Sequence, residues 1–194
     1  MPRRSVNLHG HDAERFTAGM RAIEDELEIP GDFPPEVMVA AEEAAKRPRL
    51  PDADRTAIPF VTIDPPGARD LDQALHIERN AGGFRVHYAI ADVAAFVEPN
   101  GPIDEEAHRR GQTLYAPDHR VPLHPPVLSE EAASLLPGQV RPALVWTIDL
   151  DASGEGTKVD VARALVRSRA QLDYPQVQKQ IAADAADESL MLLR

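Results

Sequence analysis

The chain has 194 residues, of which 43% are hydrophobic and 27% charged, and its formal net charge is −11 at pH 7. This composition is typical of a globular domain, and no apolar run approaches the roughly 20 residues that a membrane span needs. The absence of cysteine excludes disulfide-linked partners and is typical of a cytoplasmic protein. The acidic balance alone argues against nucleic-acid binding, because such proteins usually present basic surfaces to phosphate.

Residues 1–54 are predicted to form a helical N-terminal segment. Apolar residues recur at helical spacing between His11 and Ile29, with Asp12 placed to cap the start and Pro30-Gly31 the end. A second helix is expected from Glu36 to about Lys46. A polar, proline-bearing connector follows, so we place the domain boundary after residue 54.

Three carboxylates, those of Asp64, Asp70 and Asp72, lie within nine residues. Asp64 ends a strand-like run and precedes a turn rich in proline and glycine. Residues 71–77 are apolar enough for a second strand, in which Asp70 and Asp72 would point to one face. Gathered carboxylates repel one another unless a cation lies between them, and oxygen ligands suit Mg²⁺. The sequence therefore predicts a metal site, with solvated surface acids as the alternative.

The middle of the chain is rich in strands, and helices flank it. The predicted fold class is therefore α+β (mixed α/β). The spacing of acids from Asp149 to Asp160 imitates a Ca²⁺-binding loop, but the flanking strands favour a hairpin turn. The expected elements are the hairpins Ala74–Arg79 with Phe84–Val93 and Ala143–Asp151 with Thr157–Arg169, and helices at Asp104–Arg110, at Ser129 and from Gln176 to Ala183.

Five short motifs between about Phe33 and about Ile181 carry a family resemblance. They are Thr62-Ile63-Asp64-Pro65 with Arg69-Asp70-Leu71-Asp72-Gln73-Ala74; His87-Tyr88-Ala89-Ile90-Ala91-Asp92-Val93; Asp104-Glu105-Glu106-Ala107 with Arg110-Gly111; Tyr115-Ala116-Pro117; and Pro122-Leu123-His124-Pro125 with Leu128-Ser129. In order and spacing they resemble the ribonuclease II/R family, whose catalytic unit is the RNB domain. The resemblance implies that residues 55–194 are the N-terminal part of such a domain, truncated at its C-terminus.

Members of that family are hydrolytic exoribonucleases that degrade RNA from its 3′ end with Mg²⁺ held by aspartates. The resemblance implies the same reaction on single-stranded RNA, releasing nucleoside 5′-monophosphates, with Mn²⁺ as an alternative ion. It implies Asp64, Asp70, Asp72 and Gln73 as metal ligands and Asp72 as the catalytic residue. It also implies that Tyr115 stacks on a base near the RNA 3′ end, a contact that tolerates any sequence.

Gln73 departs from the family pattern, which usually has a fourth aspartate at this position. Its amide oxygen can ligate a cation but contributes no charge. The alternative function is therefore a catalytically impaired RNA-binding or regulatory homologue. A nucleotide-sugar transferase, suggested by Asp70-x-Asp72 alone, does not account for the other motifs.

Overall fold

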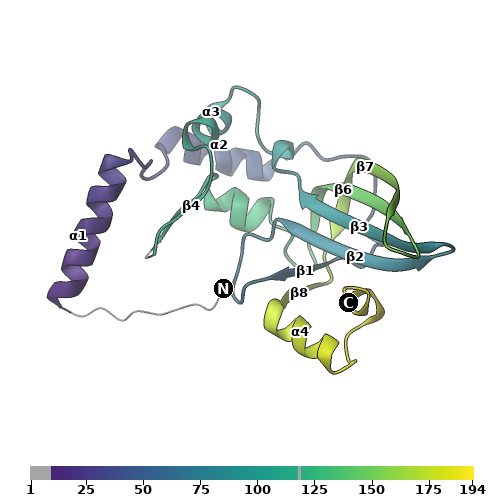
Figure 1. Cartoon of the computed structure of the whole chain (residues 1–194). Helices are drawn as coiled ribbons and strands as arrows, with labels where there is room; N and C mark the ends of the chain where they lie inside the picture. The colour runs from purple at the N-terminus through teal and green to yellow at the C-terminus, as the bar shows by residue number, and fades with distance from the viewer. Residues whose placement is uncertain (1–9, 118) are drawn as a thin grey trace.

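The computed structural model describes residues 10–117 and 119–194 (Figure 1). Its centre is a six-stranded sheet with the strand order β7-β6-β3-β2-β1-β8. Neighbouring strands are antiparallel except β1 and β8, which are parallel. A separate two-stranded ribbon pairs β4 with β5. The strands are β1 (Val61–Asp64), β2 (Gln73–Asn80), β3 (Gly83–Ala91), β4 (Leu114–Tyr115), β5 (Arg120–Val121), β6 (Val140–Asp151), β7 (Gly156–Arg167) and β8 (Ala170–Asp173).

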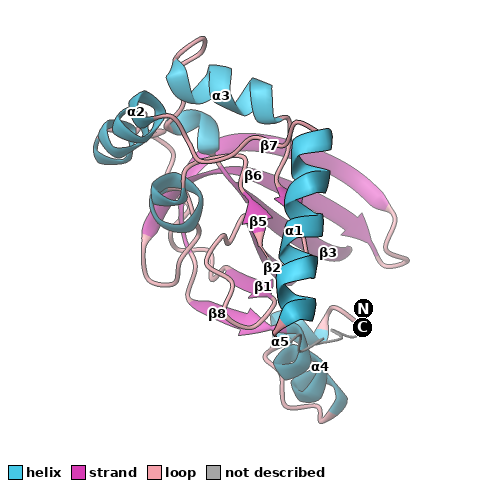
Figure 2. Ribbon diagram, turned by 90° about the vertical axis from the view of Figure 1, so that its left-hand side faces the viewer, coloured by secondary structure: helices cyan, strands magenta, loops and turns pink. Residues whose placement is uncertain are grey.

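Helices lie at both ends of this sheet, which confirms the predicted mixed α/β class. The α2, α3 and η2 helices gather at one end, and α4 and α5 lie beyond β8 (Figures 1 and 2). Among the described residues, no helix has both the length and the apolar character needed to cross a bilayer. The helices are α1 (His11–Glu26), α2 (Pro35–Lys46), the 3₁₀ turn η1 (Val93–Ala95), α3 (Pro102–Arg110), the π-helix η2 (Val127–Ala132), α4 (Tyr174–Ala182) and α5 (Glu188–Met191).

Small side chains dominate the buried face of the sheet. Ala91, Ala143 and Ala164 stand side by side across β3, β6 and β7, and all three are buried. Their small volume leaves room for larger side chains to pack onto the sheet. Two of these are fully buried: Phe60, directly before β1, and Leu71, in the loop between β1 and β2. The core therefore anchors the segment that carries the predicted acidic cluster.

The strand predicted over residues 71–77 begins later, at Gln73. The backbone of Leu71 is not paired with a strand, because its N–H donates to Ser134 Oγ (3.0 Å) and its carbonyl accepts from Leu135 N–H (2.9 Å). Asp70 and Asp72 consequently lie in a loop. The predicted alternation still holds, because Leu71 points into the core and the acids on either side of it do not.

The first helix also differs from its predicted bounds. Gly10, rather than Asp12, is the N-cap residue of α1, and no side chain caps this end. The helix ends at Glu26 because Glu28 takes a left-handed conformation (φ 51°), which turns the chain before Pro30. No residue of α1 is buried, and the helix stands away from the sheet (Figure 1).

Candidate active site

The three predicted acids and the predicted stacking tyrosine line one cavity of about 610 Å³. The cavity lies between the end of β1 with the loop that follows it and the β4–β5 ribbon, which supplies Tyr115. Asp64 is the last residue of β1, and the loop supplies Asp70 and Asp72. Arg120 of the same ribbon also lines it. Residues separated by about 50 positions are thus brought together by the fold.

A buried serine fixes the loop that carries Asp70 and Asp72. The Ser134 hydroxyl donates to the Arg69 carbonyl (2.6 Å) and accepts the Leu71 N–H. Ser134 is 1% exposed, so these bonds are shielded from water. Its hydroxyl is a structural support for the acidic loop and is not exposed as a nucleophile.

The carboxylates of Asp64 and Asp72 are held in an unfavourable electrostatic environment. Desolvation, followed by the charge of Asp70, raises the pKa of Asp64. Desolvation and then the charges of Asp70 and Asp64 raise the pKa of Asp72, although part of its side chain faces solvent. Asp64 Oδ2 is buried and has no hydrogen-bond partner. Such a pair is stabilised by a nearby cation.

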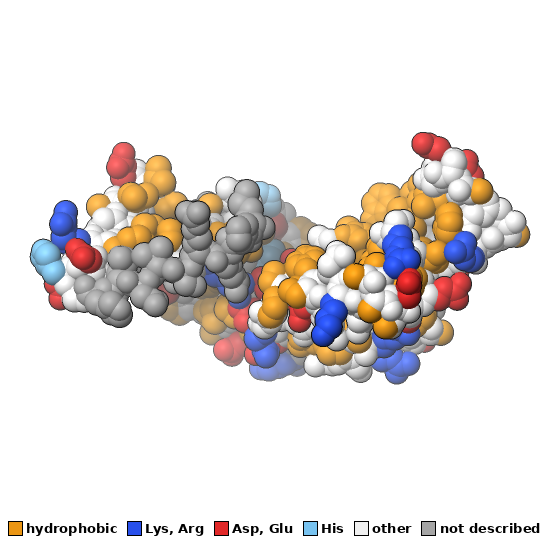
Figure 3. All heavy atoms as spheres, turned by 60° about the horizontal axis from the view of Figure 1, so that its bottom comes forward, with side chains coloured by type: hydrophobic (Ala, Val, Ile, Leu, Met, Phe, Trp, Pro, Cys, Tyr) orange, Lys and Arg blue, Asp and Glu red, His pale blue; other side chains and the backbone are white. Residues whose placement is uncertain are grey.

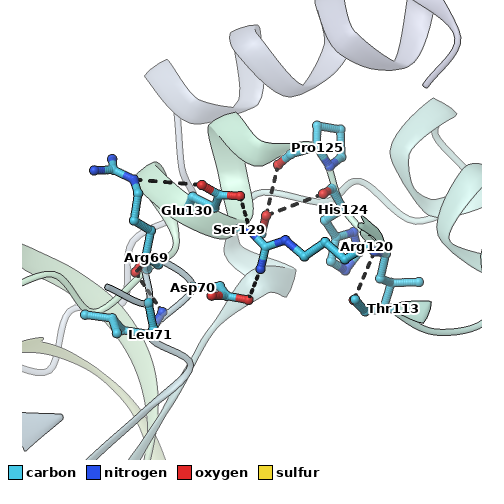
Figure 4. Close-up of polar contacts among 12 residues, drawn as sticks. Arg69, Asp70, Leu71, Thr113, Arg120, His124, Pro125, Ser129 and Glu130 are labelled. Atoms are coloured by element: carbon cyan, nitrogen blue, oxygen red, sulfur yellow. Dashed lines mark hydrogen bonds and ion pairs between the residues drawn. The ribbon is translucent and has the colours of Figure 1, made fainter. Parts of the chain in front are cut away.

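Asp70 differs from the other two acids because it already has a cationic partner. The Arg120 guanidinium donates from Nη1 to Asp70 Oδ2 (2.7 Å) and from Nη2 to Glu130 (Figure 4). Desolvation disfavours the charged form of the Arg120 guanidinium. The carboxylates of Asp70 and Glu130 outweigh this effect, so the pKa of the guanidinium is raised. Neither Arg120 nor Glu130 was among the residues singled out from the sequence.

Gln73 lies at the start of β2, and its amide oxygen is occupied. The Tyr88 hydroxyl donates a hydrogen bond to Gln73 Oε1. Gln73 does not line the cavity described above; it lines an adjacent one of about 370 Å³ that shares Asp70, Asp72 and Arg120. Gln73 is thus near two of the acids but separate from Asp64.

Carboxylate oxygens, which the three acids supply, are the ligands that a hard ion such as Mg²⁺ prefers. Within the part of the chain that the structure describes, no three acidic or histidine side chains converge closely enough to enclose a metal. Mg²⁺ commonly takes only one or two protein carboxylates and completes its shell with water and phosphate oxygens. The repulsion around Asp64 and Asp72, and the unpartnered Asp64 Oδ2, fit this kind of site.

Tyr115 offers an accessible aromatic face at the cavity edge. Its side chain is 75% exposed. It stands directly opposite Arg120 in the β4–β5 ribbon, and residues so placed project from the same face. The ring therefore has the exposure that base stacking needs, beside the acidic loop.

The motif from Asp104 to Gly111 supports this ribbon through the contacts of Arg110. Arg110 is buried in α3, lies over the Phe33 ring (3.7 Å from its centroid) and donates to Glu106 (2.6 Å). It also donates to the carbonyl of Pro122 (3.2 Å), directly after β5. These motif residues therefore hold the ribbon in place and lie outside the cavity itself.

Comparisons with known proteins agree with this geometry. The model of the RNB domain family matches residues 53–192. Exoribonuclease 2 of Vibrio vulnificus is 40% identical over 126 residues, which cover 64% of this chain and 19% of that protein. Ribonuclease R of Acidithiobacillus ferrooxidans is 33% identical over 161 residues, covering 81% of this chain and 37% of that protein.

Solved structures show the same fold. RNase R of Mycoplasma genitalium, in complex with ribose-methylated single-stranded RNA, superposes with a TM-score of 0.79 at 28% identity, over 91% of this chain and 29% of that one. Yeast Ssd1, a pseudonuclease, shares the fold at 21% identity (TM-score 0.63, over 78% of this chain and 18% of that one). The chain thus spans about a fifth to just over a third of these relatives. The family match and the relatives confirm the resemblance in the motifs: the chain belongs to the RNB domain family.

Proposed function

We propose that this chain forms the acidic part of the active site of a Mg²⁺-dependent, hydrolytic 3′-to-5′ exoribonuclease. The observation that carries the proposal is the convergence of Asp64, Asp70, Asp72 and Tyr115 on one cavity. Membership of a family that contains Exoribonuclease 2 and Ribonuclease R supports the reaction class. In this proposal residues 1–54 are a helical segment, of which residues 1–9 lie outside the described residues, and residues 55–194 are the N-terminal part of the catalytic domain.

Asp64 and Asp72 would hold Mg²⁺, or Mn²⁺ in its place, with Asp70 and Gln73 as further oxygen donors. The bound ion would activate water and neutralise charge on the phosphate during hydrolysis. Asp72 is the proposed catalytic residue, because it lines the cavity with both other acids and its pKa is raised by desolvation and then by the charges of both.

Tyr115 would stack on a base of single-stranded RNA at the cavity edge. On the face shown in Figure 3, lysine and arginine side chains are scattered among acidic and apolar ones, and the described residues form no continuous basic patch there. With a net charge of −11, affinity for phosphate would therefore depend on the metal and a few arginines. We also propose a cytoplasmic location, which the cysteine-free sequence supports.

The test is Mg²⁺-dependent digestion of a 5′-labelled single-stranded RNA by the full-length protein, either unchanged or carrying Asp72→Asn or Asp160→Asn. Asp160 is an exposed acid on β7 and serves as the matched control. Asp72→Asn is expected to reduce turnover at least about 100-fold while RNA binding persists, because the metal supplies much of the transition-state stabilisation. Unchanged turnover in Asp72→Asn would contradict the assignment.

A second candidate is an RNA-binding or regulatory homologue without turnover. The observation that favours it is Gln73, a neutral residue whose oxygen is already bonded to Tyr88. The fold is compatible with loss of activity, since yeast Ssd1 is a pseudonuclease. No release of monophosphates by the unchanged protein, together with release by Gln73→Asp, would favour this candidate.

A further inference from the structure

Arg120 connects three segments that are far apart in the sequence. It lies on β5, Asp70 lies in the β1–β2 loop, and Glu130 lies on η2. Figure 4 shows its guanidinium between the two carboxylates, with Arg69 reaching Glu130 from the other side (3.8 Å). The side chains of Arg120, Asp70 and Glu130 are 35%, 28% and 22% exposed, so water only partly screens this bridge.

The ion pairs of Arg120 with Asp70 and Glu130, called the bridge below, make Asp70 different from the other two acids of the cavity. The charge of Asp70 is compensated by Arg120, and one of its oxygens is already bonded. Among the described residues, no lysine or arginine forms an ion pair with Asp64 or Asp72, and Asp64 Oδ2 is buried without a hydrogen-bond partner. A divalent ion that enters the cavity therefore meets two carboxylates that have no cationic partner among the described residues and one that Arg120 holds.

The bridge also sets the position of the stacking tyrosine. Tyr115 and Arg120 are paired residues of a ribbon only two residues long on each strand. A ribbon this short has little stability of its own. The contact from Arg120 to Asp70 therefore ties Tyr115 to the acidic loop across the cavity.

We propose that Arg120 is a positioning residue, which competes with the metal for Asp70 and holds the Tyr115 ribbon against the acidic loop. This inference rests on the proposed function, because it assumes that the acids bind a divalent ion. It implies two effects of opposite sign. Removing the guanidinium should strengthen metal binding, because the cavity gains uncompensated negative charge, and should weaken RNA binding, because the ribbon loses its tether.

The experiment measures Mn²⁺ binding to this chain by calorimetric titration, and binding of a short single-stranded RNA in the presence of Mn²⁺. The variants are Arg120→Gln, Arg120→Lys and the double variant Arg120→Gln/Asp70→Asn. Arg85→Gln is the matched control, because it breaks the Arg85–Asp149 ion pair (2.6 Å) between β3 and β6, outside the cavity. Thermal unfolding of each variant verifies that it is folded.

Arg120→Gln is expected to bind Mn²⁺ about threefold to tenfold more tightly and RNA more weakly, as expected for loss of one nearby positive charge. Arg120→Lys keeps the charge, so its Mn²⁺ affinity should stay within about twofold of the unchanged chain. The double variant should not show the tighter Mn²⁺ binding, because it lacks the Asp70 carboxylate that Arg120→Gln releases. A purely structural role would weaken both kinds of binding in Arg120→Gln.

Unchanged or weaker Mn²⁺ binding by Arg120→Gln would overturn the inference while leaving the proposed metal site intact. If Arg120→Gln does not fold, Arg120→Lys decides: it must match the unchanged chain in Mn²⁺ affinity and bind RNA more weakly, since a lysine cannot bridge both carboxylates as a fork. Absence of Mn²⁺ binding by the unchanged chain, or binding that Asp72→Asn does not reduce, would overturn both the proposed function and the inference.

Discussion

The Tyr88 hydroxyl donates a hydrogen bond to the side-chain oxygen of Gln73 across β3 and β2. Position 73 is where the family pattern usually has an aspartate, so this contact gives the amide a structural partner of its own. Desolvation, then Tyr174 and Asp64, raises the pKa of the Tyr88 hydroxyl, which therefore remains a donor at neutral pH. Gln73 is accommodated by its surroundings, and its neutrality limits the negative charge beside Asp72.

Gln73→Asp is expected to destabilise the metal-free chain and to increase its stabilisation by Mg²⁺. The added carboxylate increases repulsion near Asp70 and Asp72, and the same charge strengthens binding of a cation. We expect the metal-free unfolding midpoint to fall by roughly 1–3 °C, measured by circular dichroism with and without Mg²⁺. Tyr88→Phe is the control for loss of the hydrogen bond alone. Equal midpoint changes with and without metal would contradict the prediction.

Asp72→Asn is expected to stabilise the metal-free chain. The pKa of Asp72 is raised in the folded state, so the folded chain holds this proton more tightly than the unfolded chain. Stability therefore falls as pH rises from the ordinary value of 3.8 through the raised pKa, and the loss persists at neutral pH.

The neutral amide removes this loss, so the unfolding midpoint of Asp72→Asn at pH 7 should rise by roughly 1–3 °C. The difference from the unchanged chain should shrink towards pH 4, where Asp72 becomes protonated. Asp160→Asn, at an exposed position on β7, should show neither effect. A lower midpoint for Asp72→Asn at pH 7 would show that its carboxylate has a stabilising partner.

The sequence predicted the acidic cluster because its signal is local. Leu71 is apolar between two acids, and burial of that one side chain turns Asp70 and Asp72 away from the core. The hairpin of β6 and β7 was confirmed, since its turn and alternating strands are contiguous in the chain. Both features depend on neighbours within a few residues.

The contacts that complete the cavity join residues far apart in the chain, so no local sequence pattern predicts them. Arg120 and Asp70 are 50 residues apart, and an ion pair between them has no spacing rule. The strand β8 pairs in parallel with β1 and has only four residues, too short for a clear alternation. The acidic motif in α3 was recognised as a pattern in the sequence. That its Glu106 binds Arg110, which in turn contacts the end of the ribbon, could be seen only from the three-dimensional packing.

Arg110→Met is expected to destabilise the chain strongly. The Arg110 and Glu106 side chains are 2% and 6% exposed, and the change removes the buried partner of this carboxylate. The partner that remains, Arg109, makes two hydrogen bonds to Glu106 from an exposed position. Breaking a buried pair in this way costs about 3–5 kcal/mol, measurable by urea unfolding. Arg109→Met is the matched control: Arg109 contacts the same Glu106 but is 53% exposed, so its loss should cost about 0–1 kcal/mol. Similar losses in both variants would contradict the buried-pair argument.

Tyr115→Ala is expected to weaken single-stranded RNA binding without loss of stability. Tyr115 is 75% exposed, so its removal uncovers little core, whereas a stacked base loses about 1–3 kcal/mol of binding free energy. That range corresponds to roughly a fivefold to 150-fold rise in Kd. The measurement is fluorescence anisotropy of a labelled oligonucleotide with Mg²⁺ at low salt, because the charge of −11 leaves little affinity to lose at high salt.

Tyr115→Phe keeps the aromatic face and removes only the hydroxyl, so it should bind RNA within about twofold of the unchanged chain if stacking is the relevant contact. Oligonucleotides of different base composition should lose affinity similarly in Tyr115→Ala, since every base offers a π-face. An equal loss in Tyr115→Phe would assign the contact to the hydroxyl. Unchanged affinity in Tyr115→Ala would remove Tyr115 from the RNA interface and leave the cavity to the acids and Arg120.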